Sequence, residues 1–336
     1  MISRKTTLSK KYTDVERLVC HSKTSLMMGV KDPKTGRSLV AKCILLLPEN
    51  THGEKGRQMA LRTAAHMDPH WQEVTPRTVE EVMEEAHAMY TLRKCSGAVD
   101  LVEVLLEPGS TRVVLVMELL EGGLLSEFML DHTSGMKEPE VQAAASRLLN
   151  VLREAHKTGI AHHDLRPAHV MLTLEGRLDS VKMVDFSKGA GGGVAARPKF
   201  DHDAAIATSS QRWYQPPEVA VQESCETSVY AGNMWSFGWM LLAMLTGSEE
   251  MFEDPHPPWL VAEPRKLPSG HVQDAWFKMA QRWIDKELKT VLTKLRVHGA
   301  RKESTDIIQK LLTVDPRDRL TAEGALRHPW FQCTYM

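Results

Sequence analysis

Apolar and polar residues follow two different periods along the chain, and the change falls close to residue 121. Short apolar runs, LVAKCILLL from Leu39 and VVLVMEL from Val113, predict two buried strands, and the first of them carries one lysine. Between them, the segment TVEEVMEEAHAMYTL places its apolar residues mostly on one face of a helix. The first part of the chain is therefore predicted to be a mixed α/β unit.

The period becomes helical after the EGG tripeptide at 121–123. Behind Pro139, which suits the first turn of a helix, the apolar positions are Val141, Ala144, Ala145, Leu148, Leu149 and Leu152. The strong periodic segments from there to Phe331 are helical as well. The second part is therefore predicted to be mainly α-helical.

Two segments depart from both periods. Residues 48–77 are polar with one short helical stretch, which indicates an excursion from the first part. Residues 189–199, GAGGGVAARPK, are rich in glycine but lack the strand and helix that flank a phosphate-binding loop, so they are interpreted as a mobile loop.

Composition and charge narrow the classes of partner. Lys and Arg number 42 against 43 Asp and Glu, a net charge of -1, which favours neither nucleic acid nor an anionic membrane as a partner. No apolar run is long enough to span a bilayer, and the basic start lacks the apolar segment of a secretory signal. Five scattered cysteines without a CxxC pair do not form a zinc pattern and leave disulfide pairing open.

Three charged residues lie in motifs that could carry chemistry. Taken alone, Lys42, Asp164 and Asp185 have ordinary structural interpretations, as a solvated strand lysine, a turn or helix cap, and a strand end. Their order along the chain changes that interpretation. The motifs are VAK at 40–42, HHDLRPAHVML at 162–172, VDFS at 184–187, QPPE at 215–218, NMWSFGWM at 233–240 and LLTVDPRDRLTAEGALRHPWF at 311–331.

In this order the motifs resemble the signatures of the protein-kinase superfamily over roughly residues 39–331. The resemblance implies an α+β, bilobal protein-kinase-like fold in a single domain, 1–336. Its N-lobe, 1–120, has a small mixed β-sheet, a helix C and the insertion 48–77. Its C-lobe, 121–336, is mainly α-helical.

The resemblance also assigns residues to a nucleotide site. Lys42 matches the strand lysine that holds the α and β phosphates of ATP. Glu85 fits the helix glutamate that pairs with this lysine, ahead of Glu81 and Glu84.

Other matched positions lie at the hinge and in the catalytic loop. Met117 falls at the gatekeeper position, and Glu118 begins the hinge. Asp164 matches the catalytic base that accepts the substrate hydroxyl proton, and Arg166 replaces the lysine of the same loop. Asp185 matches the magnesium-binding aspartate.

Three further matches are structural. Glu218 and Arg319 match a buried ion pair that braces the helical lobe. Asn233 replaces the aspartate that supports the catalytic loop, so it keeps a hydrogen-bond acceptor but loses the charge.

Several departures from the family bear on phosphate transfer. The family has a G-x-G-x-x-G turn about 15 to 20 residues before the lysine, but LVCHSKTSLMMGVKDPKTGRS contains none, and Gly29 and Gly36 fit a hairpin or turn. His169 replaces an asparagine that gives oxygen to a second magnesium, and imidazole nitrogen suits magnesium poorly. Ser187 replaces the glycine of D-F-G and restricts the backbone there. A minor alternative is a zinc site made of His162, His163 and His169.

Without a glycine-rich loop, and with a degenerate catalytic loop, the sequence resembles the With-No-Glycine-loop group of the secreted rhoptry-type kinases of apicomplexan parasites. This resemblance implies secretion into the parasitophorous vacuole or cyst wall, through a leader not seen in the sequence. It also implies an N-lobe whose first strands are replaced or remodelled.

The departures predict a pseudokinase, a protein-binding or scaffold module with little or no phosphotransfer and weak or no ATP binding. No cofactor is then expected, the partners are proteins, and the chain is a monomer. The alternative is an atypical Ser/Thr protein kinase that uses ATP and Mg, with Asp164 as base and Asp185 holding one metal. A small-molecule kinase is a third alternative, which the WSFG and HPWF segments disfavour.

Two segments are candidates for a partner surface. One is the excursion 48–77, and the other is Met251–Val297, which carries Trp259, Trp276 and Trp283. Packing of these tryptophans within the helical lobe is the favoured interpretation.

Overall fold

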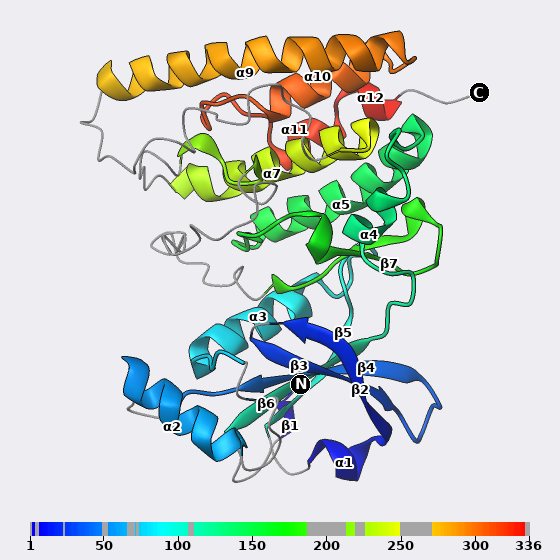
Figure 1. The fold of residues 1–336 in the computed structure, drawn as a ribbon, viewed down its shortest axis with the longest axis vertical. Coiled ribbons are helices and arrows are strands. Elements are labelled where there is room, and N and C mark those ends of the chain that lie inside the picture. Colours follow the sequence, from blue (N-terminus) through cyan, green and yellow to red (C-terminus); the bar gives the residue numbers. More distant parts are fainter. Residues whose placement is uncertain are drawn as a thin grey trace. The chain divides into compact units, whose positions relative to one another are not determined.

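The computed structural model describes most of the chain in two compact units (Figure 1). The boundary lies between Leu120 and Glu121, except that residues 95–97 belong to the second unit and Asp185 and Phe186 belong to the first. Within the described ranges, no helix has the length and apolar character that a membrane span requires. The predicted loop 189–199 lies outside these ranges, which are 2–3, 7–22, 24–48, 53–65, 71, 74–106, 111–186, 213–218, 226–248 and 271–332.

Within the described residues, the first unit is built on a six-stranded sheet with the order β1-β5-β6-β4-β3-β2. The strands are β1 (Ile2–Ser3), β2 (Thr13–Ser22), β3 (Ser25–Lys31), β4 (Ser38–Leu45), β5 (Leu101–Leu106) and β6 (Arg112–Glu118). Neighbours are antiparallel except for β1 and β5, which are parallel. The two predicted strands are β4 and β6, and the predicted mixed sheet is confirmed.

A hairpin of β2 and β3 stands where the family carries its glycine-rich turn. Ser22 pairs with Ser25 across the turn, at the expected distance before Lys42. Gly29 lies within β3 opposite Val40, so it does not form the turn. Gly36 has φ +69° in the connection from β3 to β4, a left-handed conformation that favours glycine.

The resemblance implies first strands that are replaced or remodelled; β2 and β3 are both present and paired, with register shifts in β2 between Thr13 and Glu16 and between Arg17 and His21. Leu26 and Val30 are buried at alternate positions of β3, and Met28 between them packs against the same apolar cluster. This period of two anchors β3 beside β4 without any glycine at the turn.

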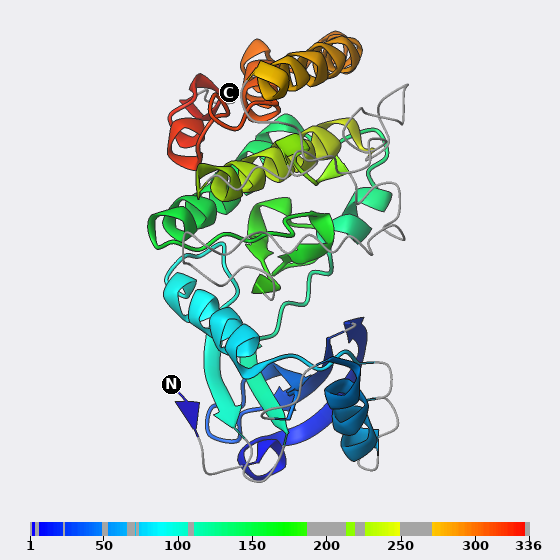
Figure 2. The ribbon, with the colours of Figure 1, turned by 90° about the vertical axis from the view of Figure 1, so that its left-hand side faces the viewer.

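The two faces of the sheet have different covers. On one face, a buried cluster joins the sheet to α1 (Leu8–Lys11) and α2 (Gly53–Ala65). The members of this cluster from β4 are the alternate residues Leu39, Ala41, Cys43 and Leu45. On the other face, Lys42 contacts α3 (Val79–Leu92), so α2 and α3 lie on opposite sides of the sheet (Figure 2).

The excursion 48–77 belongs to this cluster as far as it is described. Ala60 of α2, Trp71 and Val74 are all buried there. A segment that is polar in composition therefore folds by burying one apolar side against the sheet. These buried residues form a cover of the sheet, so they are not a partner surface.

The second unit is mainly helical within the described residues, as predicted. Its helices are α4 (Leu125–Leu130), α5 (Glu138–Lys157), α7 (Glu226–Thr246), α9 (His271–Val297), α10 (Lys302–Leu311), α11 (Ala322–Leu326) and α12 (Pro329–Gln332). A small antiparallel sheet of β7 (Val170–Leu172) and β8 (Val181–Met183), with the short 3-10 turn Pro167–His169 before it, follows α5. The period of the sequence did not predict these two short strands.

Packing explains part of the tryptophan-rich segment. Trp283 of α9 stacks on Trp213 with ring centroids 6.2 Å apart, and Trp213 stacks on Trp239 at 4.8 Å. Trp276 is partly buried, whereas Trp259 lies outside the described residues. The packing interpretation therefore holds for Trp283.

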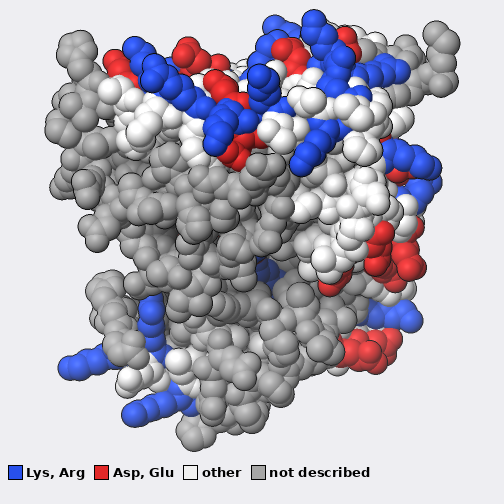
Figure 3. Space-filling view, turned by 45° about the horizontal axis from the view of Figure 1, so that its top comes forward, with Lys and Arg blue, Asp and Glu red and all other residues white. Residues whose placement is uncertain are grey.

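The outer side of α9 is rich in cations. Among its described residues the exposed basic side chains are Lys278, Arg282, Lys286, Lys289, Lys294 and Arg296. Figure 3 shows lysine and arginine gathered over this end of the second unit, with acidic side chains among them. Because Asp274 and Asp285 lie on the same helix, we interpret this side as a solvated helix face.

The buried ion pair Glu218–Arg319 braces the second unit. Its two bonds are 2.7 and 2.8 Å long, and both side chains are almost completely buried. Arg319 also donates to the carbonyl oxygens of Thr313, Ala231 and Val314, so all five of its N–H donors have partners. This pairing matches the prediction from the sequence.

We expect Arg319→Met to lower the free energy of unfolding by about 3 to 5 kcal/mol, because Glu218 would keep a buried charge without a partner. Denaturant unfolding measures this loss. Arg327→Met is the matched control, since Arg327 forms an exposed ion pair with Glu323 on the same unit, and its cost is expected to stay below about 1 kcal/mol. Equal stability of the two variants would contradict the bracing role.

Candidate active site

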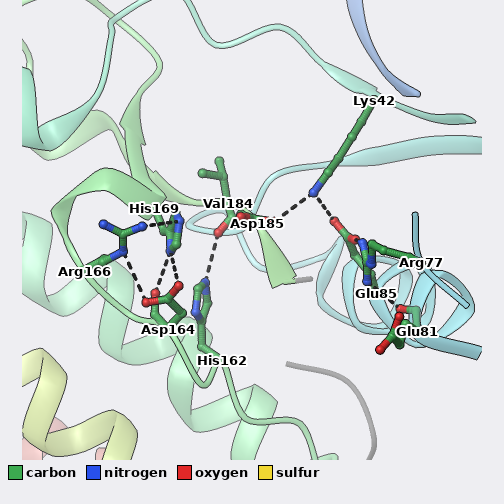
Figure 4. Close-up of polar contacts among 10 residues, drawn as sticks. All are labelled: Lys42, Arg77, Glu81, Glu85, His162, Asp164, Arg166, His169, Val184 and Asp185. Atoms are coloured by element: carbon green, nitrogen blue, oxygen red, sulfur yellow. Dashed lines mark hydrogen bonds and ion pairs between the residues drawn. The ribbon is translucent and has the colours of Figure 1, made fainter. Parts of the chain in front are cut away.

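A buried network of charges surrounds Lys42 in the first unit (Figure 4). The Lys42 Nζ donates to Glu85 Oε1 at 2.7 Å and to Asp185 Oδ1 at 2.8 Å. Burial acts to lower the pKa of Lys42, but the two carboxylates outweigh it and hold that pKa above the ordinary lysine value. Lys42 is therefore a cation at neutral pH. The structure selects Glu85, and not Glu81 or Glu84, as its partner on α3.

Arg77 is a member of this network that the sequence did not reveal. Its side chain is buried, and it donates from Nη1 to Glu85 Oε2 and from Nη2 to the carbonyl oxygen of Glu81 at 2.9 Å. The residue after it, Thr78, forms a capping box with Glu81 at the start of α3. The sequence TVEE is typical of such a cap. Arg77 comes directly before this helix start, and that position was the one feature of the sequence that could have pointed to its role.

Asp185 adopts an uncommon backbone conformation. Its φ is +58°, in the left-handed region, which aspartate tolerates better than most residues. Phe186 beside it is buried. The next residue, Ser187, lies outside the described residues, so the predicted effect of that departure stays a prediction.

The predicted gatekeeper and hinge residues lie at the end of β6. Met117 is buried and pairs with Val40 of β4. The carboxylate of Glu118 accepts a hydrogen bond from the backbone N–H of Asp100 at 2.7 Å. Part of the role of Glu118 is therefore to hold the connection before β5.

In the second unit, the catalytic loop rests on Asn233. The side-chain oxygen of Asn233 accepts a hydrogen bond from the backbone N–H of His162 at 3.0 Å and a second from His156 Nε2 at 3.2 Å. Burial lowers the pKa of His156 to about 4, so its ring is neutral at pH 7 and Nε2 carries a hydrogen. The His162 ring donates from Nε2 to the Val184 carbonyl at 3.0 Å. A neutral amide therefore suffices to hold the loop.

His169 and Arg166 lie on either side of Asp164. His169 Nδ1 lies 2.7 Å from the backbone carbonyl of Asp164, so Nδ1 is the nitrogen that carries the hydrogen. His169 Nε2 then has the lone pair, and the Arg166 guanidinium lies 3.4 Å away from it. Arg166 Nε is also 3.2 Å from the Asp164 carboxylate, as an ion pair without hydrogen-bond alignment. At the position where the family has an asparagine oxygen, this chain thus has the imidazole of His169 beside the guanidinium of Arg166.

A nucleotide with magnesium fits these residues only in part. In the first unit, Lys42 provides a cation for phosphate and Asp185 provides carboxylate oxygen for a metal. In the second unit, His169 does not fit magnesium, because its lone-pair nitrogen is not an oxygen ligand and faces Arg166. Within the described residues, no three or more His, Cys, Asp or Glu side chains are grouped so that they could hold a metal ion.

The relatives found by sequence comparison are named as protein kinases. Serine/threonine-protein kinase H1 of Mus musculus is 29% identical over 254 residues, which are 76% of this chain and 52% of that protein. The calcium/calmodulin-dependent protein kinase type II alpha chain of Drosophila melanogaster is 27% identical over 216 residues, which are 64% of this chain and 35% of that protein. The chain therefore spans about half or less of the length of these relatives.

The solved structure of the twitchin kinase region from C. elegans has the same fold. Its TM-score is 0.65 at 22% identity, and the match covers 100% of this chain and 48% of that one. The family model described as the protein kinase domain matches residues 48–331, well over half of the chain, although its match begins after Lys42. With a kinase-like sheet, helical unit and charge network in place, this chain belongs to the protein kinase family.

Proposed function

We propose that this chain is a pseudokinase, a kinase-fold module that binds or regulates other proteins and transfers phosphate slowly or not at all. The observation that carries the proposal is His169, which donates from Nδ1 to the Asp164 carbonyl and faces Arg166 at Nε2. A second magnesium ion would have to bind a nitrogen next to a guanidinium, against both ligand preference and charge repulsion. Phosphoryl transfer depends on metal ions to neutralise the developing charge, so its rate would fall steeply.

The β2–β3 hairpin gives independent support. Ser22 and Ser25 pair on either side of the turn, and Gly29 lies within β3, away from the turn. A turn without glycine is less able to fold its backbone N–H groups closely around phosphate. Loss of this cover and loss of a metal ligand act on the same transition state, so the two deficits multiply in the rate.

An active Ser/Thr protein kinase is the second candidate, and one observation favours it. Lys42, Glu85 and Asp185 are assembled at hydrogen-bond distance, and Asp164 is retained in its loop. Such an enzyme would use ATP and magnesium, with Asp164 as base and Asp185 as the metal ligand. Both relatives named above are protein kinases by name, and one of them is named a serine/threonine kinase, which is consistent with this candidate.

We also propose a place in the With-No-Glycine-loop group of rhoptry-type kinases, with a resemblance to the bradyzoite pseudokinase, because the segment before Lys42 lacks the G-x-G-x-x-G turn. The strands β2 and β3 are both present, with two register shifts in their pairing, so the proposal rests on the missing glycines alone. Secretion to the parasitophorous vacuole or cyst wall and a monomeric state belong to the same proposal. A tagged protein retained inside the secreting cell would contradict this location.

A phosphotransfer assay separates the two candidates. The chain, with a general protein substrate, ATP and magnesium, is expected to incorporate no more phosphate than Asp164→Ala, because the second metal ligand is missing. Incorporation that requires magnesium and is lost in Asp164→Ala would establish the active kinase instead. In that case, ATP with magnesium at about 100 times its dissociation constant should stabilise the fold by about 2.7 kcal/mol.

The role of His169 has its own test. His169→Asn restores an oxygen ligand, so we expect magnesium to increase the nucleotide-induced rise in melting temperature of this variant more than that of the unaltered chain. His169→Ala is the matched control, because it removes the imidazole without supplying an oxygen. If both variants respond to magnesium equally, His169 is not the cause of the deficit.

A further inference from the structure

Glu85 is a buried carboxylate held by two cations. It is 1% exposed, its Oε1 accepts from Lys42, and its Oε2 accepts from Arg77. A buried carboxylate oxygen without a donor is costly, because it has lost its water and gained nothing in return. Lys42 alone cannot meet this need, since it also donates to Asp185.

Arg77 also balances the charge of the network. Lys42 and Arg77 contribute two positive charges, and Glu85 and Asp185 contribute two negative charges. Without Arg77, two carboxylates would share one cation, and the three side chains would carry a net negative charge in a mostly buried place. Because the two carboxylates repel each other, we expect one of them to move away from Lys42 in that arrangement.

The backbone of Arg77 is fixed beside the strand that carries Lys42. Its N–H donates to the Leu45 carbonyl at 2.9 Å, and its carbonyl accepts from the Leu47 N–H at 2.8 Å. Its side chain reaches the first turn of α3 through the Glu81 carbonyl at 2.9 Å. Arg77 therefore connects the end of β4 to the start of α3.

The excursion that ends at Arg77 sets its position. Trp71 and Val74, a few residues earlier, are buried in the cluster on the opposite face of the sheet. The packing of Trp71 and Val74 on one face of the sheet thus places the guanidinium of Arg77 on the other face, beside Glu85. The segment is joined to the chain after β4 by a parallel bridge between Leu46 and Arg77.

We propose that Arg77 is a positioning residue that holds Glu85 and α3 against Lys42, and that it keeps Glu85 in place even when Lys42 is removed. The relevance to nucleotide rests on the proposed role of Lys42, but the positioning itself does not. Arg77 makes the excursion 48–77 a part of the site. The pairing of Lys42 with Glu85 is then a permanent feature of this chain.

Hydrogen exchange tests the second half of the proposal. In Lys42→Met, amide exchange in α3 is expected to stay within about threefold of the unaltered chain, because Arg77 still holds Glu85. In Arg77→Met, exchange in α3 is expected to increase by about tenfold or more, with a smaller change in β6. Leu8→Ala is the matched control, since it weakens the cluster on the other face of the sheet from α1, outside the excursion that ends at Arg77.

Rescue by the conservative variant tests the first half. Arg77→Lys keeps a cation near Glu85, so amide exchange in α3 is expected to return part of the way to that of the unaltered chain. A role of Arg77 in packing alone would leave Arg77→Lys no better than Arg77→Met.

Three results would overturn the proposal: faster α3 exchange in Lys42→Met, no recovery of α3 exchange in Arg77→Lys, or equal effects of Arg77→Met and Leu8→Ala on α3. If Arg77→Met does not fold, Lys42→Met still decides the matter through α3 exchange. None of these measurements uses phosphotransfer or nucleotide. Failure of the proposed function would therefore leave this inference standing, and the reverse also holds.

Discussion

The buried charge network at Lys42 is the constraint on which the first unit depends. A lysine with almost no exposure is tolerable only with carboxylate partners, and here Glu85 and Asp185 provide them. Two carboxylates in turn require a second cation, which Arg77 supplies from the end of the excursion. The strand β4, the helix α3 and the end of the excursion are therefore linked through four side chains. A network of this kind is consistent with nucleotide binding, but it does not require catalysis.

The loop at 162–172 in the second unit keeps the aspartate of a catalytic loop, Asp164, but differs from the family at other polar positions. Asn233 holds the backbone of His162 with a neutral oxygen, and His156 shares that oxygen. Around Asp164, hydrogen bonds of His169 and the charge of Arg166 take the place of an oxygen-rich metal site. The contacts that hold the backbone of this loop are therefore made by Asn233 and His169.

The sequence predicted the residues whose spacing is fixed by regular structure. The resemblance to the protein kinases assigned Glu85, which lies on the predicted helix, and the Glu218–Arg319 pair, and both pairings are present. Arg77 was missed because an arginine in a polar segment has the pattern of a solvated side chain. Its burial depends on Trp71 and Val74 packing on the opposite face of the sheet. The two nitrogens of His169 could not be assigned roles either, because a hydrogen bond to a backbone carbonyl leaves no mark in the sequence.

The central claim is that the chain has lost the metal dependence of a kinase while keeping its fold. Calorimetric titration with a non-hydrolysable ATP analogue, with and without magnesium, measures that dependence directly. The account predicts either no binding or an affinity that magnesium changes by less than about threefold, which is below 1 kcal/mol. An affinity that rises tenfold or more with magnesium, about 1.4 kcal/mol, would contradict it.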